Sequence, residues 1–244
     1  MIAFQLYSAR NFPYLDATLA MLAEAGYRAV EPFAGLYDDV GALRDALDRH
    51  GLAAPSGHMA LETLEERPGE ALRVSRTLGF GKVYAPWIAP DARPRDREGW
   101  EAFARRLHAA GAPVREAGMT FGWHNHDFEM RDLGGGVTAL DVIAETGVAL
   151  ELDLAWVAKG GGDPVQWLRK LGGQVATVHV KDIAAQGENA AEDGWADVGH
   201  GIMDWEAIVA ELRRQGIEHW VVEHDNPADA ARFARRSLAT LGGW

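Results

Sequence analysis

The sequence predicts a single α/β domain over residues 1–244, folded as a (β/α)8 TIM barrel. Strand-like runs alternate with amphipathic helical runs along the whole chain, which is typical of a parallel sheet. The alternation repeats eight times at about 30 residues per pair, as in this barrel. An open doubly wound sheet is the rival fold. It usually has a glycine-rich phosphate loop after an early strand, whereas the first strand here ends in Tyr7-Ser8-Ala9-Arg10.

The eight expected strands are short apolar runs that end in polar or ligand-capable residues. They lie at residues 2–7, 28–31, 52–58, 82–85, in the stretch 120–129, and at 148–153, 175–181 and 219–223. Each is followed by a run with helical spacing of apolar residues, so every strand receives a helix.

Several helices carry clear start or break signals. Asp163-Pro164 predicts a helix start with an N-cap and a proline at the first helical position, and Asn226-Pro227 predicts the start of the last helix. Pro113 should kink or split the helical segment 95–117. The stretch 182–203 is rich in Gly, Ala and acidic residues and is expected to be a long functional loop.

Composition excludes several classes of site and partner. The chain has no cysteine, so neither disulfides nor thiolate metal ligands are available. A net charge of −12 disfavours nucleic acid as a partner. No apolar run is long enough to span a bilayer, and no secretory signal is visible, so we expect no membrane association and a cytoplasmic location.

The last polar residues of strands five to eight form a candidate metal site. They are His124, Asp153, His179 and Glu223. Because neighbouring parallel strands lie about 4.8 Å apart, four such residues at the carboxyl end of a barrel can converge on one point. Strand alternation supports this, since each shares its face with the residue two positions earlier, as Asp153 does with Glu151. Two imidazoles and two carboxylates suit a divalent cation with open positions for water or substrate.

Five motifs of the chain resemble those of a known family. The motifs that carry the resemblance are Trp123-His-Asn-His-Asp-Phe-Glu129, Glu151-Leu-Asp-Leu-Ala-Trp156, Val178-His-Val-Lys-Asp182, Gly199-His-Gly-Ile-Met-Asp-Trp205 and Val222-Glu-His-Asp225. They are similar to motifs of the sugar phosphate isomerase/epimerase family. That family is one of the xylose-isomerase-like TIM barrels, which also include endonuclease IV, ketose 3-epimerases and inosose dehydratases.

The resemblance implies that Asp153, His179 and Glu223 are metal ligands. His124 stands where many ketose epimerases have a glutamate that shares the proton transfer with the glutamate of strand eight. The mechanism with two glutamates therefore cannot be carried over unchanged. Trp156 stands where related epimerases often have a histidine that contacts the substrate.

The expected cofactor is one divalent ion (Mn²⁺, Mg²⁺, Co²⁺ or Zn²⁺) that binds the carbonyl and an adjacent hydroxyl of a keto-polyol and stabilises an enediolate. A side chain must then remove the proton next to the carbonyl. Lys181 is the first candidate base, because a nearby cation and burial would lower its pKa. A salt bridge to a rim acid is the alternative role for Lys181. His126 is a second acid–base candidate, and Glu223 could combine ligand and proton transfer.

The candidate substrate contacts come from the ends of several strands: Glu31, His58, Tyr7, Trp87 and Trp156. Glu31 could instead orient a metal ligand or form a structural ion pair. The three aromatic residues could present ring faces to a sugar or could serve packing alone.

These features predict a metal-dependent isomerase or epimerase of a small sugar or keto-polyol. The alternative is a lyase, namely a dehydratase of a cyclic keto-polyol similar to inosose dehydratase. A non-catalytic sugar-binding barrel and a nuclease similar to endonuclease IV fit the sequence less well. A homo-oligomer is compatible with the resemblance, and no feature of the sequence supports a phosphorylated substrate.

Overall fold

The barrel strands form where the sequence places short apolar runs. The computed structural model describes residues 1–244 and contains an eight-stranded sheet in the order β2-β1-β10-β7-β6-β5-β4-β3, in which every pairing is parallel. The strands are β1 (Ile2–Gln5), β2 (Ala29–Glu31), β3 (Ser56–His58), β4 (Lys82–Ala85), β5 (Thr120–His124), β6 (Ala149–Asp153), β7 (Val175–Val180) and β10 (Trp220–Val222). Each predicted strand is present, and most are shorter than predicted.

The sheet closes on itself between β2 and β3 through a short seam. Ala29 and Ala53 form an isolated parallel bridge, and the Val30 amide donates to the Ala53 carbonyl at 2.9 Å. Further along, the His58 amide donates to the Pro32 carbonyl, also at 2.9 Å. The result is a nearly closed TIM barrel in one domain, which confirms the predicted fold.

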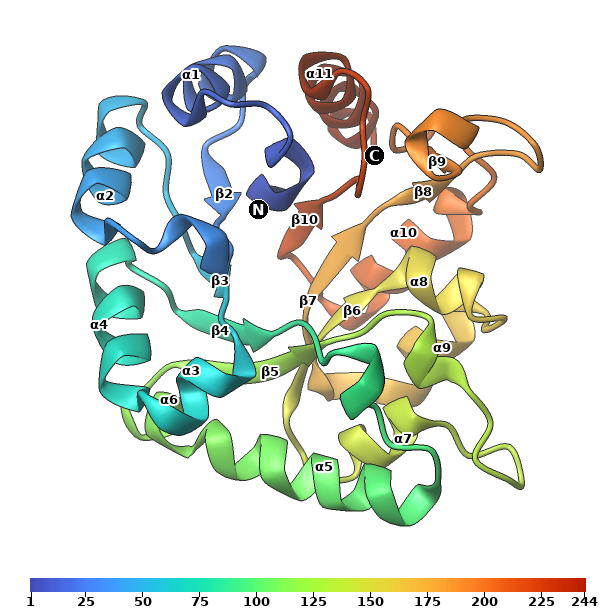
Figure 1. Ribbon diagram of the computed structural model, residues 1–244. Helices are drawn as coiled ribbons and strands as arrows, with labels where there is room; N and C mark the ends of the chain where they lie inside the picture. The colour runs from blue at the N-terminus through green and yellow to red at the C-terminus, as the bar shows by residue number, and fades with distance from the viewer.

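Helices surround the strands, as Figure 1 shows. They are α1 (Leu15–Ala25), α2 (Val40–Arg49), α3 (Leu61–Glu66), α4 (Pro68–Leu78), α5 (Arg97–Ala110), α6 (Ala112–Glu116), α7 (Ala139–Ala144), α8 (Leu154–Lys159), α9 (Pro164–Leu171), α10 (Trp205–Gln215) and α11 (Ala230–Gly242). None has both the length and the apolar character needed to cross a bilayer. The predicted split of segment 95–117 is confirmed, because α5 ends at Ala110 and Pro113 lies in the first turn of α6.

The two predicted proline-led helix starts have different outcomes. Asp163 caps α9 and accepts from the amides of Val165 and Gln166 at 2.9 and 3.1 Å, as expected. The start at Asn226-Pro227 is wrong, because α11 begins later and Asp229 is its cap. Between Pro227 and Asp229 the backbone bonds to another segment instead of starting a helix, since the Ala228 amide donates to the Glu192 carboxylate at 2.6 Å.

The expected loop 182–203 is ordered around one buried carboxylate. It starts and returns through a short antiparallel pair, β8 (Asp182–Ile183) and β9 (Trp195–Ala196). The Asp182 side chain accepts from the amides of Gly199, Gly201 and Met203 at 2.8–3.2 Å. It also accepts from the Trp205 indole at 2.9 Å. The loop is therefore fixed against the end of β7.

The barrel interior changes from apolar to polar toward the carboxyl ends of the strands. Ala3, Ala29 and Val221 form a small apolar group of their own, separate from the large core. Phe121 and Trp123 point the other way and pack in that large core. Further along the strands, the buried polar side chains are Gln5, Glu31, Ser56, His58, His124, Glu151, Asp153, Thr177, His179 and Glu223. This polar end is where a site can form.

Candidate metal centre and pocket

The strand register brings the predicted polar residues to one end of the barrel. Asp153 on β6 pairs with His179 on β7, and His124 on β5 pairs with Glu151 on β6. Because Glu151 and Asp153 lie two positions apart on one strand, their side chains share a face. All four side chains are almost completely buried. The interior therefore holds two layers of ligand-capable groups.

The predicted metal ligands come together in the outer layer. One donor atom each from His124, Asp153, His179 and Glu223 lies within 4.8 Å of the other three. His179 Nδ1 is 2.9 Å from Glu223 Oε2. Asp153 Oδ2 is buried and has no hydrogen-bond partner, although an unpaired buried carboxylate oxygen is costly. We call these four residues the quartet, and their donor set fits a divalent cation.

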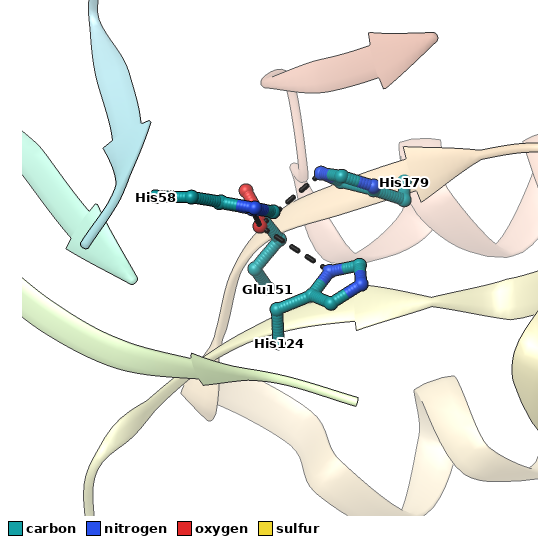
Figure 2. A group of neighbouring side chains, drawn as sticks. All are labelled: His58, His124, Glu151 and His179. Carbon is teal, nitrogen blue, oxygen red and sulfur yellow. Dashed lines mark hydrogen bonds and ion pairs between the residues drawn. The ribbon is translucent and has the colours of Figure 1, made fainter. Parts of the chain in front are cut away.

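A second group lies one layer further into the barrel, around Glu151. Figure 2 shows three imidazole rings facing this carboxylate. Glu151 Oε2 is 2.5 Å from His58 Nε2, 3.1 Å from His179 Nε2 and 3.3 Å from His124 Nδ1. Glu31 joins from β2, with Oε1 at 3.0 Å from His179 Nε2 and 3.2 Å from His58 Nε2. We call Glu31, His58 and Glu151 the deep cluster.

His58, His124, Glu151 and His179 also have donor atoms within 4.8 Å of one another, so two groups compete for the ion. Ligands on a tetrahedral ion with bonds of about 2.0–2.1 Å are about 3.3 Å apart. The 2.5 Å contact between His58 and Glu151 is shorter than that and matches a charge-assisted hydrogen bond. These contacts tie His58, Glu31 and Glu151 together, although Glu151 Oε1 has no hydrogen-bond partner. The quartet also keeps an unpaired oxygen, Asp153 Oδ2, and it offers the cation two carboxylates instead of one, so we take it as the candidate metal site.

A pocket of about 600 Å³ opens over the quartet. His124 and Glu223 are part of its lining, together with His58 and His126. The wall also includes Tyr7, Phe33, Trp87 and Trp156. Trp87 is 46% exposed and packs edge-on against His126, with ring centres 5.0 Å apart. A small polar molecule with an apolar face fits such a lining.

Burial and neighbouring charges set the protonation of the quartet. Burial raises the pKa of Asp153 to about 7, against the pull of Lys181. Burial lowers the pKa of His124 well below its usual range, and His179 lowers it further. Burial would raise the pKa of Glu223, but Lys181 and His179 together hold it well below its usual range. Glu223 is thus ionised and His124 neutral at pH 7, the forms in which both can bind a cation. Burial would lower the pKa of His179, but Glu151 and Glu223 raise it above its usual range, so a cation bound there displaces a proton from this ring.

Lys181 is fully buried behind the pocket wall. Its ammonium donates to Asp225 at 2.7 Å and to Glu223 at 3.2 Å, and it lies 4.3 Å from the centre of the Trp195 ring. Burial alone would lower the pKa of Lys181, but Asp225 and Glu223 raise it above its usual value. The expected lowering of this pKa is therefore wrong, and the alternative role predicted for Lys181, a salt bridge, is the one present.

Comparison with known proteins identifies the family. The family model described as xylose isomerase-like TIM barrel matches residues 19–241. The chain belongs to the xylose isomerase-like TIM barrel family. A rhizopine catabolism protein, MocC of Rhizobium meliloti, is 27% identical over 93% of this chain and 81% of its own length. An inosose dehydratase of Geobacillus kaustophilus is 24% identical over 92% of this chain and 84% of its own length.

Solved structures agree on the fold of this xylose isomerase-like barrel. A sugar phosphate isomerase/epimerase from Parabacteroides distasonis superposes with a TM-score of 0.82 at 21% identity, covering 98% of this chain and 92% of that one. The IolI protein with a bound zinc atom superposes with a TM-score of 0.77 at 16% identity, covering 99% and 96% of the two chains. These barrels therefore share one architecture, and the zinc atom is a property of the IolI structure.

The xylose isomerase-like barrel brings most, but not all, of the predicted site residues to the pocket. Of the expected substrate contacts, Tyr7, His58, Trp87 and Trp156 line it. Glu31 is not part of the lining and is fully buried, where its carboxylate accepts from Gln5 at 2.8 Å and also from Ser56. Its predicted alternative roles, orienting a ligand or forming an ion pair, are the ones its contacts fit.

Several residues of the site escaped the sequence reasoning. The sequence assigns Glu151 no role as a metal ligand or in catalysis, although its carboxylate contacts three imidazoles. Asp225 lines the pocket and holds Lys181. Arg10 and Arg93 are also part of the lining, and each guanidinium lies over an aromatic ring, Tyr7 at 3.9 Å and Trp87 at 4.4 Å. The motif Val222-Glu-His-Asp225 contained a signal for Asp225, since a second acid follows the ligand by two positions.

Proposed function

We propose that the protein is a divalent-metal-dependent isomerase or epimerase of a small sugar or keto-polyol. The observation that carries the proposal is the quartet at the pocket, in which four donor atoms lie within 4.8 Å and one buried carboxylate oxygen has no partner. Membership of a barrel family whose relatives include enzymes named for sugar isomerisation and inosose dehydration supports it.

The cation would be held by His124, Asp153, His179 and Glu223. Mn²⁺, Mg²⁺, Co²⁺ and Zn²⁺ all accept imidazole and carboxylate ligands. Bound there, such an ion supplies Lewis acidity that polarises a carbonyl oxygen and makes the neighbouring C–H more acidic.

Proton transfer falls to side chains that line the pocket. Glu223 has its Oε2 engaged by His179 and Lys181 at 2.9 and 3.2 Å, whereas no hydrogen bond occupies Oε1. This free oxygen is our candidate for the proton acceptor. His126 lies next to His124, with ring centres 5.0 Å apart. Burial, with help from Lys181, lowers the pKa of His126 to about 3, so its ring is neutral and can accept or relay a proton.

Lys181 works through these groups and not by touching substrate. Its ammonium bonds to Glu223 and to Asp225, both of which line the pocket. A buried cation fixed between them keeps both carboxylates ionised and oriented. Substrate itself would lie between Tyr7, Trp87 and Trp156, whose ring faces suit the C–H surface of a sugar or polyol.

Dehydration of a cyclic keto-polyol is the second candidate, because a relative that spans 92% of this chain is an inosose dehydratase. It needs the same removal of a proton next to a carbonyl. A hydroxyl one carbon further along then leaves as water, and the proton it needs would be the one taken from the carbon, passed on by Glu223 or His126.

Solvent deuterium separates the two reactions. The chelator-treated protein, reloaded with Mn²⁺, is incubated in D₂O with a panel of ketoses and cyclic keto-polyols, and the products are followed by mass spectrometry and ultraviolet absorbance. Deuterium in a product of otherwise unchanged mass indicates an isomerase or epimerase. Loss of water with a new enone absorbance indicates a dehydratase.

Variants connect this result to the quartet. Asp153→Asn should abolish both metal retention and exchange. Asp48→Asn, at a carboxylate 67% exposed on α2, makes the same chemical change away from the pocket and should leave both intact. The proposal fails if wild type retains no divalent ion, or if it retains one yet exchanges no proton in any compound of the panel.

A further inference from the structure

In the proposed function Glu151 neither holds the ion nor moves a proton, yet its carboxylate lies within ion-pair distance of both histidines of the quartet. We propose that Glu151 is a positioning residue that sets the ring orientation and tautomer of both His124 and His179. The inference rests on the proposed function, in which the quartet binds a divalent cation. The inference concerns which nitrogen of each imidazole ring is free to bind the cation.

The contacts define which nitrogen each ring can offer. Glu151 Oε2 faces His179 Nε2 at 3.1 Å and His124 Nδ1 at 3.3 Å. A carboxylate only accepts hydrogen bonds, so each nitrogen that faces it is best satisfied when it carries the hydrogen. His179 Nδ1 also faces a carboxylate, Glu223 Oε2 at 2.9 Å, so both nitrogens of this ring can carry hydrogen until an ion displaces the one on Nδ1. With the ion bound in the quartet, the lone pairs that hold it lie on His179 Nδ1 and His124 Nε2.

Because the two histidines are buried, protein groups and not water must fix the orientation of their rings. Glu151 and His179 are fully buried and His124 is 2% exposed, so bulk water cannot satisfy the nitrogens that face away from the quartet. A ligating imidazole usually donates its second N–H to a carboxylate or carbonyl, which fixes the ring and makes it a better ligand. Here one carboxylate faces two rings from neighbouring strands, because β6 lies between β5 and β7.

The two histidines do not depend on Glu151 equally. His179 Nε2 has a second acceptor in Glu31, at 3.0 Å. His124 Nδ1 forms no hydrogen bond of good geometry, and Glu151 is the only carboxylate within ion-pair distance of it. Loss of Glu151 should therefore free His124 first, whereas loss of Glu31 should disturb His179 alone. His58, 2.5 Å from Glu151 Oε2, holds the carboxylate itself in place.

Cobalt provides a readout that does not require substrate. Co²⁺ affinity is measured by competition with a chelator. The exchangeable ring N–H signals of the ligand histidines, shifted by the paramagnetic ion, are recorded by proton NMR. Wild type should bind one Co²⁺ and show two such signals.

Three Glu→Gln variants give graded expectations. Glu151→Gln should bind Co²⁺ about 10–100-fold more weakly and lose or move the signal of His124. Glu31→Gln should show a smaller loss and a change in the His179 signal only. Glu129→Gln is the matched control, because Glu129 is also fully buried but bonds to the Trp123 indole and the His126 amide instead. Its Co²⁺ affinity and both signals should stay as in wild type.

The outcomes separate this inference from the proposed function. Co²⁺ affinity within twofold of wild type and unchanged signals in Glu151→Gln would overturn the positioning role and leave the quartet standing. Two ions per wild-type chain, reduced to one in Glu151→Gln, would also overturn it, since Glu151 would then be a ligand. If no chain binds Co²⁺, the proposed function fails and this inference with it.

A measurement on unaltered protein covers the case in which Glu151→Gln does not fold. In ¹⁵N-labelled wild type loaded with Zn²⁺, nitrogen chemical shifts report the tautomer of each histidine. Hydrogen on His124 Nδ1 and on His179 Nε2 supports the positioning role. The opposite tautomer at either ring overturns it.

Discussion

Lys181→Met is the substitution whose cost the structure defines best. The side chain is fully buried, and its ammonium lies 2.7 Å from Asp225, 3.2 Å from Glu223 and 3.8 Å from Asp153. Methionine has a similar length but no charge, so it leaves these carboxylates facing one another without a cation. Removing one partner of a buried ion pair costs about 3–5 kcal/mol of unfolding free energy. For a chain of this size that is a fall in Tm of about 6–20 °C.

The assay is urea denaturation of metal-free protein, followed by tryptophan fluorescence. Lys159→Met is the matched control, because Lys159 lies 3.3 Å from the centre of the same Trp195 ring but is exposed. Loss of that exposed contact should cost about 0.5–1 kcal/mol. The two variants thus separate the buried ion pair from simple contact with the indole.

The pH dependence of Lys181→Met provides an internal check. Burial already raises the pKa of Asp225 and of Asp153, and Lys181 opposes both shifts. Without the ammonium these carboxyls hold their protons more tightly in the folded state than in the unfolded chain, so lowering the pH favours folding. The loss of unfolding free energy in Lys181→Met relative to wild type should become smaller as the pH is lowered from 7 to 5. A deficit below about 1 kcal/mol at pH 7, or one that grows on acidification, would refute the reasoning.

Three further predictions follow from other parts of the molecule. Burial raises the pKa of Glu129 to about 8, so the folded state keeps a proton that the unfolded chain releases near pH 4–5. Relative to Glu129→Gln, the unfolding free energy of wild type should therefore fall as the pH rises from 5 to 8. The same pH dependence of unfolding free energy in both proteins would contradict this. Asp182→Ala should cost about 3 kcal/mol or more and increase proteolysis of loop 182–203, because several amides lose one buried acceptor; a cost below 1 kcal/mol would show that the loop is held otherwise. Adding Mn²⁺ at about 100 times its Kd should raise the unfolding free energy by about 2.7 kcal/mol in wild type and not in Asp153→Asn, and an equal gain in both would exclude the quartet as the site.

Strand alternation explains why the fold and the quartet could be predicted. A period of two places His124, Asp153, His179 and Glu223 on interior faces, and parallel strands bring their ends to one rim. Local sequence also predicted the break before Pro113 and the cap at Asp163, because proline geometry and side-chain capping act within a few residues.

What could not be predicted depends on contacts between distant segments. The helix start at Asn226-Pro227 failed because Glu192, 36 residues away, binds the Ala228 amide. The pKa of Lys181 was expected to fall, but its carboxylate partners, Glu223 and Asp225, lie in the segment that follows β10, more than 40 residues away in sequence. Glu151 appeared to be an ordinary interior residue, since spacing along one strand shows a shared face and not which rings from β3, β5 and β7 point at it.

The seam between β2 and β3 gives the deep cluster a mechanical consequence. Few backbone hydrogen bonds join these strands, but the Glu31 carboxylate on β2 accepts from the Ser56 hydroxyl and ion-pairs with His58, both on β3. The Glu31 carboxylate therefore links β2 to β3 at the place where the fewest backbone hydrogen bonds close the barrel. Glu31 also bonds to His179, a residue of the quartet. Separation of β2 from β3 should therefore also release His179, so that local opening of the barrel and loss of metal-ligand geometry occur as one cooperative event.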